Sequence, residues 1–135
     1  MIIVDTSALF AFMRIDDPDH APVSRALDVS VPLVVSPFVI AELDYLVETR
    51  IGIRAELAVL AELSSGSYEL PALTAADLIS CAALIERYSD QRVGITDASL
   101  VVLADRYQTR TICTLDRRHF SVLRTLDDRP FDIVP

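Results

Sequence analysis

The chain contains no lysine and no long apolar run, and each absence excludes a class of protein. All 12 basic residues are arginine. A Walker A phosphate loop and a Schiff-base mechanism are therefore excluded, because both require a lysine. No stretch approaches the roughly 18 uninterrupted apolar residues that a membrane-spanning helix needs. The longest apolar segment is broken by Pro37 and Glu42.

Cysteines and targeting signals are equally sparse. Cys81 and Cys113 lie within apolar segments and show no CxxC or Cys/His spacing. Buried free thiols are therefore favoured over a disulfide or a zinc site. The segment Met1–Asp5 lacks the basic start and the small-residue cleavage site of a signal peptide. We expect a cytoplasmic protein with no membrane association.

The composition indicates one domain over residues 1–135, with a core that buries roughly 65–70% of the unfolded surface. A hydrophobic content of 52% implies strands buried on both faces, or an apolar patch that meets a partner. The net charge of −8 argues against holding nucleic acid by bulk electrostatics alone. Divalent ions at clustered carboxylates would offset that charge locally.

Short apolar runs alternate along the chain with segments of helical period. This alternation indicates an α/β domain whose parallel sheet is covered on both faces. We predict strands over residues 2–5, 32–36, 68–70, 111–114 and 131–134, with 68–70 at an edge. We predict helices over 7–13, 19–28, 37–49, 53–63, 74–88 and from 96 or 97 to 107.

Four acidic residues stand at positions that this architecture brings to one edge of the sheet. Asp5 and Asp116 end predicted strands, Asp97 opens a predicted helix, and Glu42 lies in a helix that follows a strand. Sites in open parallel sheets form beyond the carboxyl ends of the strands. Clustered carboxylates repel one another, and a divalent cation is the simplest relief. The pattern predicts metal-dependent phosphodiester hydrolysis.

Each acid also has a structural alternative. Asp5 precedes Thr6 and Ser7, a sequence that caps helices or forms turns. An acid such as Asp97 at a helix start gains roughly 0.3–1 kcal/mol from the helix dipole. Asp116 is compatible with an exposed turn.

Glu42 is harder to explain structurally, because its helical neighbours are apolar. A carboxylate in such a stripe costs several kcal/mol unless it is paired or bound to a metal. The alternative is a buried salt bridge to an arginine. The neighbours at three and four positions are Phe38, Val39, Tyr45 and Leu46.

The segments that carry these acids resemble the four acidic motifs of the PIN-domain ribonucleases and, more narrowly, the VapC toxins of bacterial toxin–antitoxin pairs. They are IIVDTSALF, SPFVIAELDYL, GITDASLVVLA and TLDRRHF, in the family's order from position 1 to about 120. The resemblance implies a three-layer α/β/α PIN-like domain with a central, mainly parallel sheet. It also implies a ribonuclease that depends on Mg²⁺, with Mn²⁺ as a possible substitute, and that cuts particular tRNAs or rRNAs.

Carried over to this sequence, the resemblance assigns catalysis and metal binding to Asp5, Glu42, Asp97 and Asp116. Asp5 and Asp97 would hold the principal ion, and the other two would complete its ligands or recruit a second ion. It also implies a role in the site for the hydroxyl after the first acid, which is Thr6 or Ser7.

Arginines near the acids are candidates for binding substrate phosphates. Arg117 and Arg118 directly follow Asp116, and the guanidinium fork can take two phosphate oxygens. Surface solvation is the alternative for each. His119 also neighbours Asp116, but a turn or packing role is favoured for it over contact with substrate.

The resemblance further implies a homodimer and a VapB-type antitoxin whose tail lies across the active-site groove. Residues 53–63 are amphipathic, with Ile53, Leu57, Leu60 and Ala61 on one face. With Tyr45 and Val47, this segment is a candidate antitoxin groove or dimer surface. Packing of the segment on the sheet is the alternative.

Three rival readings of the acids come from other classes. The strongest is a non-catalytic PIN-like binding module that holds a structural metal ion. A small-phosphoester hydrolase would carry a second aspartate two positions after Asp5, where Ser7 stands. A receiver domain is disfavoured by the missing lysine.

Overall fold

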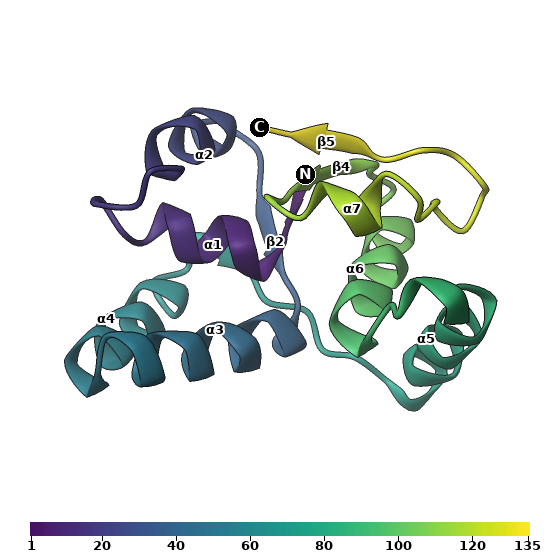
Figure 1. The fold of residues 1–135 in the computed structure, drawn as a ribbon, viewed down its shortest axis with the longest axis horizontal. Helices are drawn as coiled ribbons and strands as arrows, with labels where there is room; N and C mark the ends of the chain where they lie inside the picture. Colours follow the sequence, from purple (N-terminus) through teal and green to yellow (C-terminus); the bar gives the residue numbers. More distant parts are fainter.

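A five-stranded parallel sheet forms the middle layer of the molecule (Figure 1). The computed structural model describes all residues from 1 to 135. Neighbouring strands pair in the order β3-β2-β1-β4-β5, every pair is parallel, and β3 lies at an edge. The predicted parallel sheet is therefore confirmed. The strands are β1 (Ile2–Val4), β2 (Leu33–Val35), β3 (Tyr68–Glu69), β4 (Thr111–Cys113) and β5 (Asp132–Val134).

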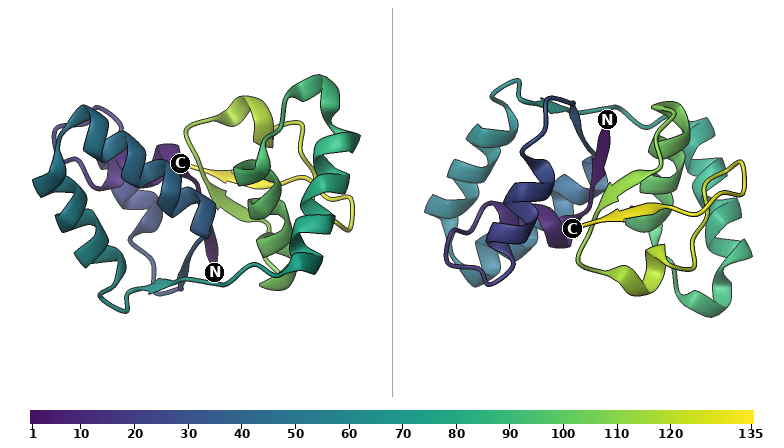
Figure 2. Two further views of the ribbon diagram at one scale, coloured as in Figure 1. Left: turned by 90° about the horizontal axis from the view of Figure 1, so that it is seen from below. Right: turned by 90° about the horizontal axis from the view of Figure 1, so that it is seen from above.

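Seven α-helices flank the sheet, and two views at right angles show how they divide (Figures 1 and 2). Helices α1 to α4 gather on one side, and α5 and α6 gather on the other. The domain thus has the expected three layers. The helices are α1 (Thr6–Phe12), α2 (His20–Leu27), α3 (Pro37–Arg50), α4 (Ile53–Leu63), α5 (Ala75–Arg87), α6 (Ile95–Arg106) and α7 (Arg117–Phe120).

Local sequence explains where α3 and α5 begin. Pro37 occupies the first turn of α3, and the side chain of Ser36 accepts a hydrogen bond from the amide of Phe38. Thr74 begins α5 with a capping box completed by Asp77. These interactions fix where α3 leaves β2 and where α5 begins on the opposite side of the sheet.

The expected start of α6 is wrong by one to two residues. Gly94 is the N-cap, so Thr96 and Asp97 lie in the first helical turn. Neither side chain caps the helix. The hydroxyl of Thr96 donates instead to Glu42, and Asp97 contacts His119. Their side chains are thereby available to the edge of the sheet.

Two short helical elements escaped the sequence analysis. They are α7 and the 3₁₀ turn η1 (Ser89–Gln91). Segments of three or four residues are too short to show a helical period.

The core is a single cluster of 30 buried hydrophobic residues. Seven polar residues are also buried, and every buried side-chain nitrogen or oxygen has a hydrogen-bond partner. Cys81 and Cys113 are buried free thiols, as predicted. None of the helices combines the length and the apolar character needed to cross a membrane.

The apolar face predicted for residues 53–63 does not pack on the sheet. Ile53, Leu57 and Leu60 are 63%, 53% and 40% exposed. Helix α4 instead buries Val59 and Leu63. The predicted face of α4 therefore remains uncovered.

Candidate active site

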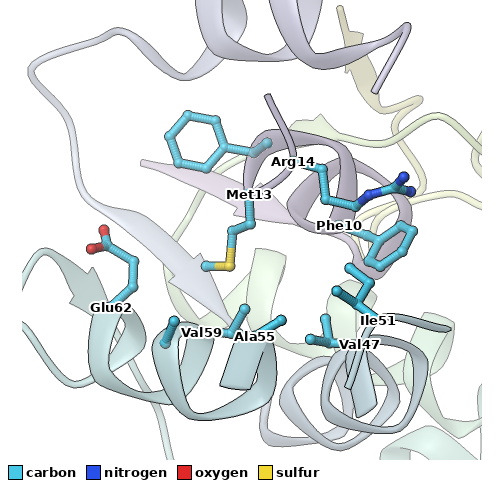
Figure 3. A pocket seen from close by; sticks show the side chains of 10 residues that line it. Phe10, Met13, Arg14, Val47, Ile51, Ala55, Val59 and Glu62 are labelled. Atoms are coloured by element: carbon cyan, nitrogen blue, oxygen red, sulfur yellow. The ribbon is translucent and has the colours of Figure 1, made fainter. Parts of the chain in front are cut away.

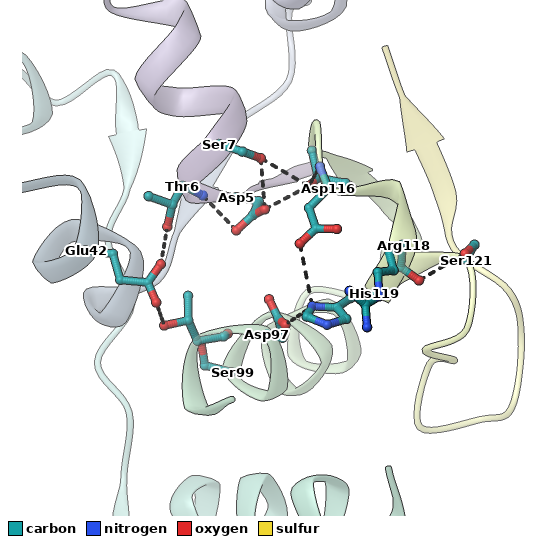
Figure 4. Close-up of polar contacts among 12 residues, drawn as sticks. Asp5, Thr6, Ser7, Glu42, Asp97, Ser99, Asp116, Arg118, His119 and Ser121 are labelled. Atoms are coloured by element: carbon teal, nitrogen blue, oxygen red, sulfur yellow. Dashed lines mark hydrogen bonds and ion pairs between the residues drawn. The ribbon is translucent and has the colours of Figure 1, made fainter. Parts of the chain in front are cut away.

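The strand register brings three of the four predicted acids together at the carboxyl edge of the sheet. Val4 of β1 lies opposite Cys113 of β4, so Asp5 and Asp116, which follow these strands, emerge side by side. Asp97 reaches the same edge from the first turn of α6. Figure 4 shows these carboxylates around a common space, with Glu42 of α3 at its border.

Asp5 combines the role of a helix cap with a place in the site. The carboxylate is the N-cap of α1 and accepts from the amide of Thr6 at 2.7 Å. Its Oδ2 accepts from the hydroxyls of Ser7 at 3.1 Å and Thr114 at 2.7 Å. Asp5 is 6% exposed, and this burial raises its pKa, while the hydrogen bonds act in the opposite direction. The two roles weighed for Asp5 are thus compatible.

Asp97 is the most strongly perturbed carboxyl of the site. Burial and the nearby charge of Asp5 raise its pKa to about 6, with a further contribution from Asp116 and an opposing one from His119. The three aspartates therefore lie close enough for their charges to repel. A divalent cation would offset this excess of negative charge.

His119 has a place in the site rather than the turn or packing role favoured from the sequence. Its Nδ1 lies 2.8 Å from Oδ2 of Asp97 and 3.6 Å from Oδ2 of Asp116 (Figure 4). No sequence signal short of the fold could have shown this contact, because α7 is too short to be predicted.

Glu42 reaches the site by a different route from the one expected. The residue is exposed, and no arginine pairs with it. The predicted cost of a buried carboxylate therefore does not arise, and the buried salt bridge is absent. Its Oε2 accepts from Thr6 at 2.9 Å and its Oε1 from Thr96 at 2.5 Å. The buried stripe of α3 consists of Val39, Leu43 and Val47.

A layer of buried hydroxyls beneath the acids was missed by sequence reasoning. Thr114 supports Asp5, and Thr96 supports Glu42. Behind them, the hydroxyls of Ser36 and Ser99 lie 2.8 Å apart and join the start of α3 to α6. The only signal was a hydroxyl within an apolar run, and such a side chain can also bond to the backbone of its own helix or turn.

The two arginines of α7 differ in whether their guanidinium groups are hydrogen-bonded within the protein. Arg117 donates to the carbonyl oxygen of Pro135. Arg118 is exposed, and its guanidinium has no partner in the protein. Of the two, Arg118 is therefore the one whose guanidinium is available to an incoming phosphate.

The donor set suits a hard divalent cation, because carboxylate oxygens are the ligands that Mg²⁺ and Mn²⁺ prefer. As they stand, no three His, Cys, Asp or Glu side chains lie close enough together to hold a metal ion, so the acids would have to draw closer around one. Hydroxyls and His119 occupy several of the carboxylate oxygens. Oδ1 of Asp97 and Oδ1 of Asp116 have no partner in the protein, whereas both oxygens of Asp5 already accept hydrogen bonds and could reach an ion only through a second lone pair.

Comparison with known proteins defines the family. The PIN domain matches residues 2–126, so the chain belongs to the PIN-domain family. It is 56% identical to Ribonuclease VapC26 of Mycobacterium tuberculosis over 135 residues, which cover 99% of this chain and 100% of the relative. The expected resemblance to VapC ribonucleases is thereby confirmed.

Solved structures support the same fold. VapC20 of Mycobacterium tuberculosis, a toxin that cleaves the sarcin–ricin loop, superposes with a TM-score of 0.80 at 22% identity, covering 87% of this chain and 92% of that one. A toxin–antitoxin complex from Klebsiella pneumoniae gives 0.70 at 16% identity, with 91% and 92% covered. FitAcB from Neisseria gonorrhoeae gives 0.59 at 17% identity, with 86% and 88% covered.

Proposed function

We propose that this ribonuclease hydrolyses phosphodiester bonds of structured tRNA or rRNA at the carboxyl edge of its sheet, and that the whole chain acts as one PIN domain. The observation that carries the proposal is the convergence of Asp5, Asp97 and Asp116 at that edge, where burial and then the charges of Asp5 and Asp116 raise the pKa of Asp97 to about 6. Such crowding destabilises the charged site without a cation, and strongly perturbed carboxyls are typical of functional sites.

Asp5, Asp97 and Asp116 would hold the ion, Mg²⁺ or its substitute Mn²⁺, and Glu42 would act at the border of the site. A bound divalent cation polarises the scissile phosphate and makes a neighbouring water a better nucleophile. Of the three aspartates, Asp116, whose side chain is 47% exposed, is the most accessible to that water.

Thr6 and Ser7 act on RNA through the acids that they orient. Their hydroxyls, expected from the resemblance to lie at the substrate, donate to Glu42 and Asp5 respectively. Arg118 supplies the free guanidinium for a phosphate of the RNA. Arg117 can contribute only after it leaves the carbonyl of Pro135.

The cleavage test uses a matched pair of substitutions in α6. Purified protein is incubated with tRNA, with ribosomal RNA and with a sarcin–ricin stem-loop, in Mg²⁺, in Mn²⁺ or with chelator. Asp97→Asn removes the proposed ligand, and Asp105→Asn makes the same change at an exposed position near the other end of the helix. Discrete fragments that require metal, disappear in Asp97→Asn and persist in Asp105→Asn support the proposal. Stabilisation by metal without cleavage of any RNA favours the non-catalytic binding module.

A second part of the proposal concerns an antitoxin partner. A groove of about 320 Å³ runs between α1 and the pair α3 and α4, and eight of its ten lining residues are apolar (Figure 3). Arg14 and Glu62 lie at opposite ends of the groove. We propose that it takes the apolar face of a VapB-type antitoxin helix, in the manner of helix-in-groove recognition. The residues that line it are Phe10, Phe12, Met13, Arg14, Val47, Ile51, Ala55, Ala58, Val59 and Glu62.

The groove is tested with a VapB-type antitoxin. Ala58→Glu places a charge in the groove, and Ala82→Glu places the same charge on the exposed face of α5. The first is expected to weaken antitoxin binding at least about tenfold by calorimetry, because an unpaired charge would be desolvated. The second leaves binding unchanged. Equal affinity of both variants for the antitoxin would show that the antitoxin does not bind in this groove.

A homodimer is the third part of the proposal. The uncovered face of α4, formed by Ile53, Leu57 and Leu60, is an apolar surface that a second copy could bury. Light scattering on the purified protein is expected to give twice the mass of one chain, and Leu57→Glu is expected to give monomer. A monomeric wild-type protein would contradict this part alone.

A further inference from the structure

The backbone of His119 is fixed independently of its side chain. The next residue, Phe120, is 1% exposed and packs edge-on against Phe131, with ring centroids 5.7 Å apart. The carbonyl oxygen of His119 accepts from the amides of Val122 and Leu123 at 3.0 and 2.8 Å. Helix α7 is therefore anchored on its buried side and at its end, which holds the imidazole at the site.

The acids of the site differ in what orients them. Asp5 has two hydroxyl donors and a backbone amide, and Glu42 has two hydroxyl donors. Asp97 accepts from no hydroxyl, and His119 is its one side-chain partner, at 2.8 Å. A carboxylate with a single hydrogen-bond donor loses its orientation when that donor is removed.

We propose that His119 is a positioning residue for Asp97. Its Nδ1–H holds Oδ2 of Asp97, which leaves Oδ1 available to the divalent cation. The contact of 3.6 Å with Asp116 extends the same donor toward the second acid. This inference rests on the metal site of the proposed function. Carboxylate ligands of metals in proteins are commonly held in this way by a hydrogen-bond partner.

The identity of the donor atom predicts which replacements are tolerated. In histidine, Nδ1 is bonded to Cγ, so it lies two bonds from Cβ. The amide nitrogen of asparagine occupies the same position along the side chain, whereas that of glutamine lies one bond further out. His119→Asn therefore keeps a donor near Oδ2 of Asp97. His119→Gln and His119→Ala do not.

The experiment measures Mn²⁺ affinity directly, by calorimetry and by the electron paramagnetic resonance of free Mn²⁺, without RNA. His119→Gln and His119→Ala are expected to raise the Kd about 10–100-fold, and His119→Asn is expected to stay within about threefold of wild type. Ser121→Ala is the matched control. It removes only a hydrogen bond of 3.1 Å to the carbonyl of Arg118 at the end of α7, so wild-type affinity is expected.

RNA cleavage supplies a second measurement. If His119 acts through the metal site, excess Mn²⁺ should restore much of the cleavage lost in His119→Gln. A loss that persists at saturating Mn²⁺ overturns the proposed role.

Four results of the affinity measurement would overturn the inference. They are an unchanged Kd in both His119→Gln and His119→Ala, a tighter Kd in either, an equal loss in His119→Asn, and an equal loss in Ser121→Ala. Asp97→Asn separates this inference from the proposed function. If Asp97→Asn binds Mn²⁺ as wild type does, the metal site itself fails, and the inference fails with it. If Asp97→Asn loses Mn²⁺ while His119→Gln matches wild type, only the role of His119 is wrong.

Discussion

The hydroxyl of Thr114 donates to Oδ2 of Asp5 at 2.7 Å and joins two residues that are 109 positions apart in the sequence. Both follow central strands of the sheet, β4 and β1, which pair in parallel. The same Thr114 hydroxyl accepts from the amide of Asp116 at 3.0 Å. One buried threonine therefore orients two of the proposed metal ligands.

Replacing Thr114 by valine should damage both stability and cleavage. The shape of the side chain is kept, but Asp5 loses a donor and the amide of Asp116 loses an acceptor. We expect the free energy of unfolding to fall by about 1–3 kcal/mol in urea titrations, and cleavage to fall with it. Thr125→Val is the control, because Thr125 is 5% exposed and bonds to Asp127 and Arg129 instead. A variant of Thr114 that cuts RNA at the wild-type rate would contradict this role.

The metal-free protein should be more stable in mild acid than at neutral pH. Burial raises the pKa of Asp5, and burial together with Asp5 raises that of Asp97 from 3.8 to about 6. Between about pH 4 and 6 the folded chain binds more protons than the unfolded chain, so stability falls as pH rises through this window. The lowered pKa values of Asp77 and Asp127 act only at lower pH.

The measurement is the Tm in chelator. A rise of about 4 °C is expected between pH 7.5 and pH 5, which is about 1 kcal/mol for a domain of this size. Asp97→Asn should flatten the slope, because it removes the carboxyl with the larger resolved shift. A Tm that increases from pH 5 to pH 7.5 would show that other groups dominate.

Glu42→Gln should separate activity from stability. Glu42 is exposed and held by the hydroxyls of Thr6 and Thr96, so the amide can keep both partners. We expect the free energy of unfolding to change by less than about 0.5 kcal/mol. Cleavage should fall about 10–100-fold through the lost charge. Glu48→Gln, at an exposed position of the same helix, should alter neither quantity.

Phe120→Ala should lower both the stability of the protein and its cleavage of RNA. The ring is 1% exposed against Phe131, and its removal is expected to cost about 3–5 kcal/mol. Cleavage should be lost even where the protein remains folded, because α7 carries His119 and Arg118. Phe120→Leu should retain most of both properties. Circular dichroism and the cleavage assay distinguish the two variants.

The placement of the acids at one edge of the sheet follows largely from local sequence patterns. Asp5 and Asp116 come directly after or close to strands, and parallel strands end at one edge whatever their order. The exposure of Glu42 could not be predicted in this way. Helix α3 is apolar on more than one side, so periodicity alone could not tell that Tyr45 is 68% exposed and that Val39 faces the core.

The contacts that support the acids could not be predicted from the sequence for a different reason. The bond from Thr114 to Asp5 and the contact of His119 with Asp97 depend on which strands and helices become neighbours. A hydroxyl or an imidazole has no preferred partner until the chain has folded around it. The apolar face of α4 differs from these contacts, because its amphipathic pattern was clear in the sequence. That face nevertheless stays exposed in the structure.

The large sequence separation of Asp5 and Thr114 has a consequence for how the protein is synthesised. Strand β1 is synthesised well before its neighbour β4 and before the residues Thr114, Asp116 and His119. A growing chain on the ribosome therefore carries no assembled nuclease site until these later residues have been added. Each new toxin molecule therefore lacks its assembled site during most of the synthesis of this domain.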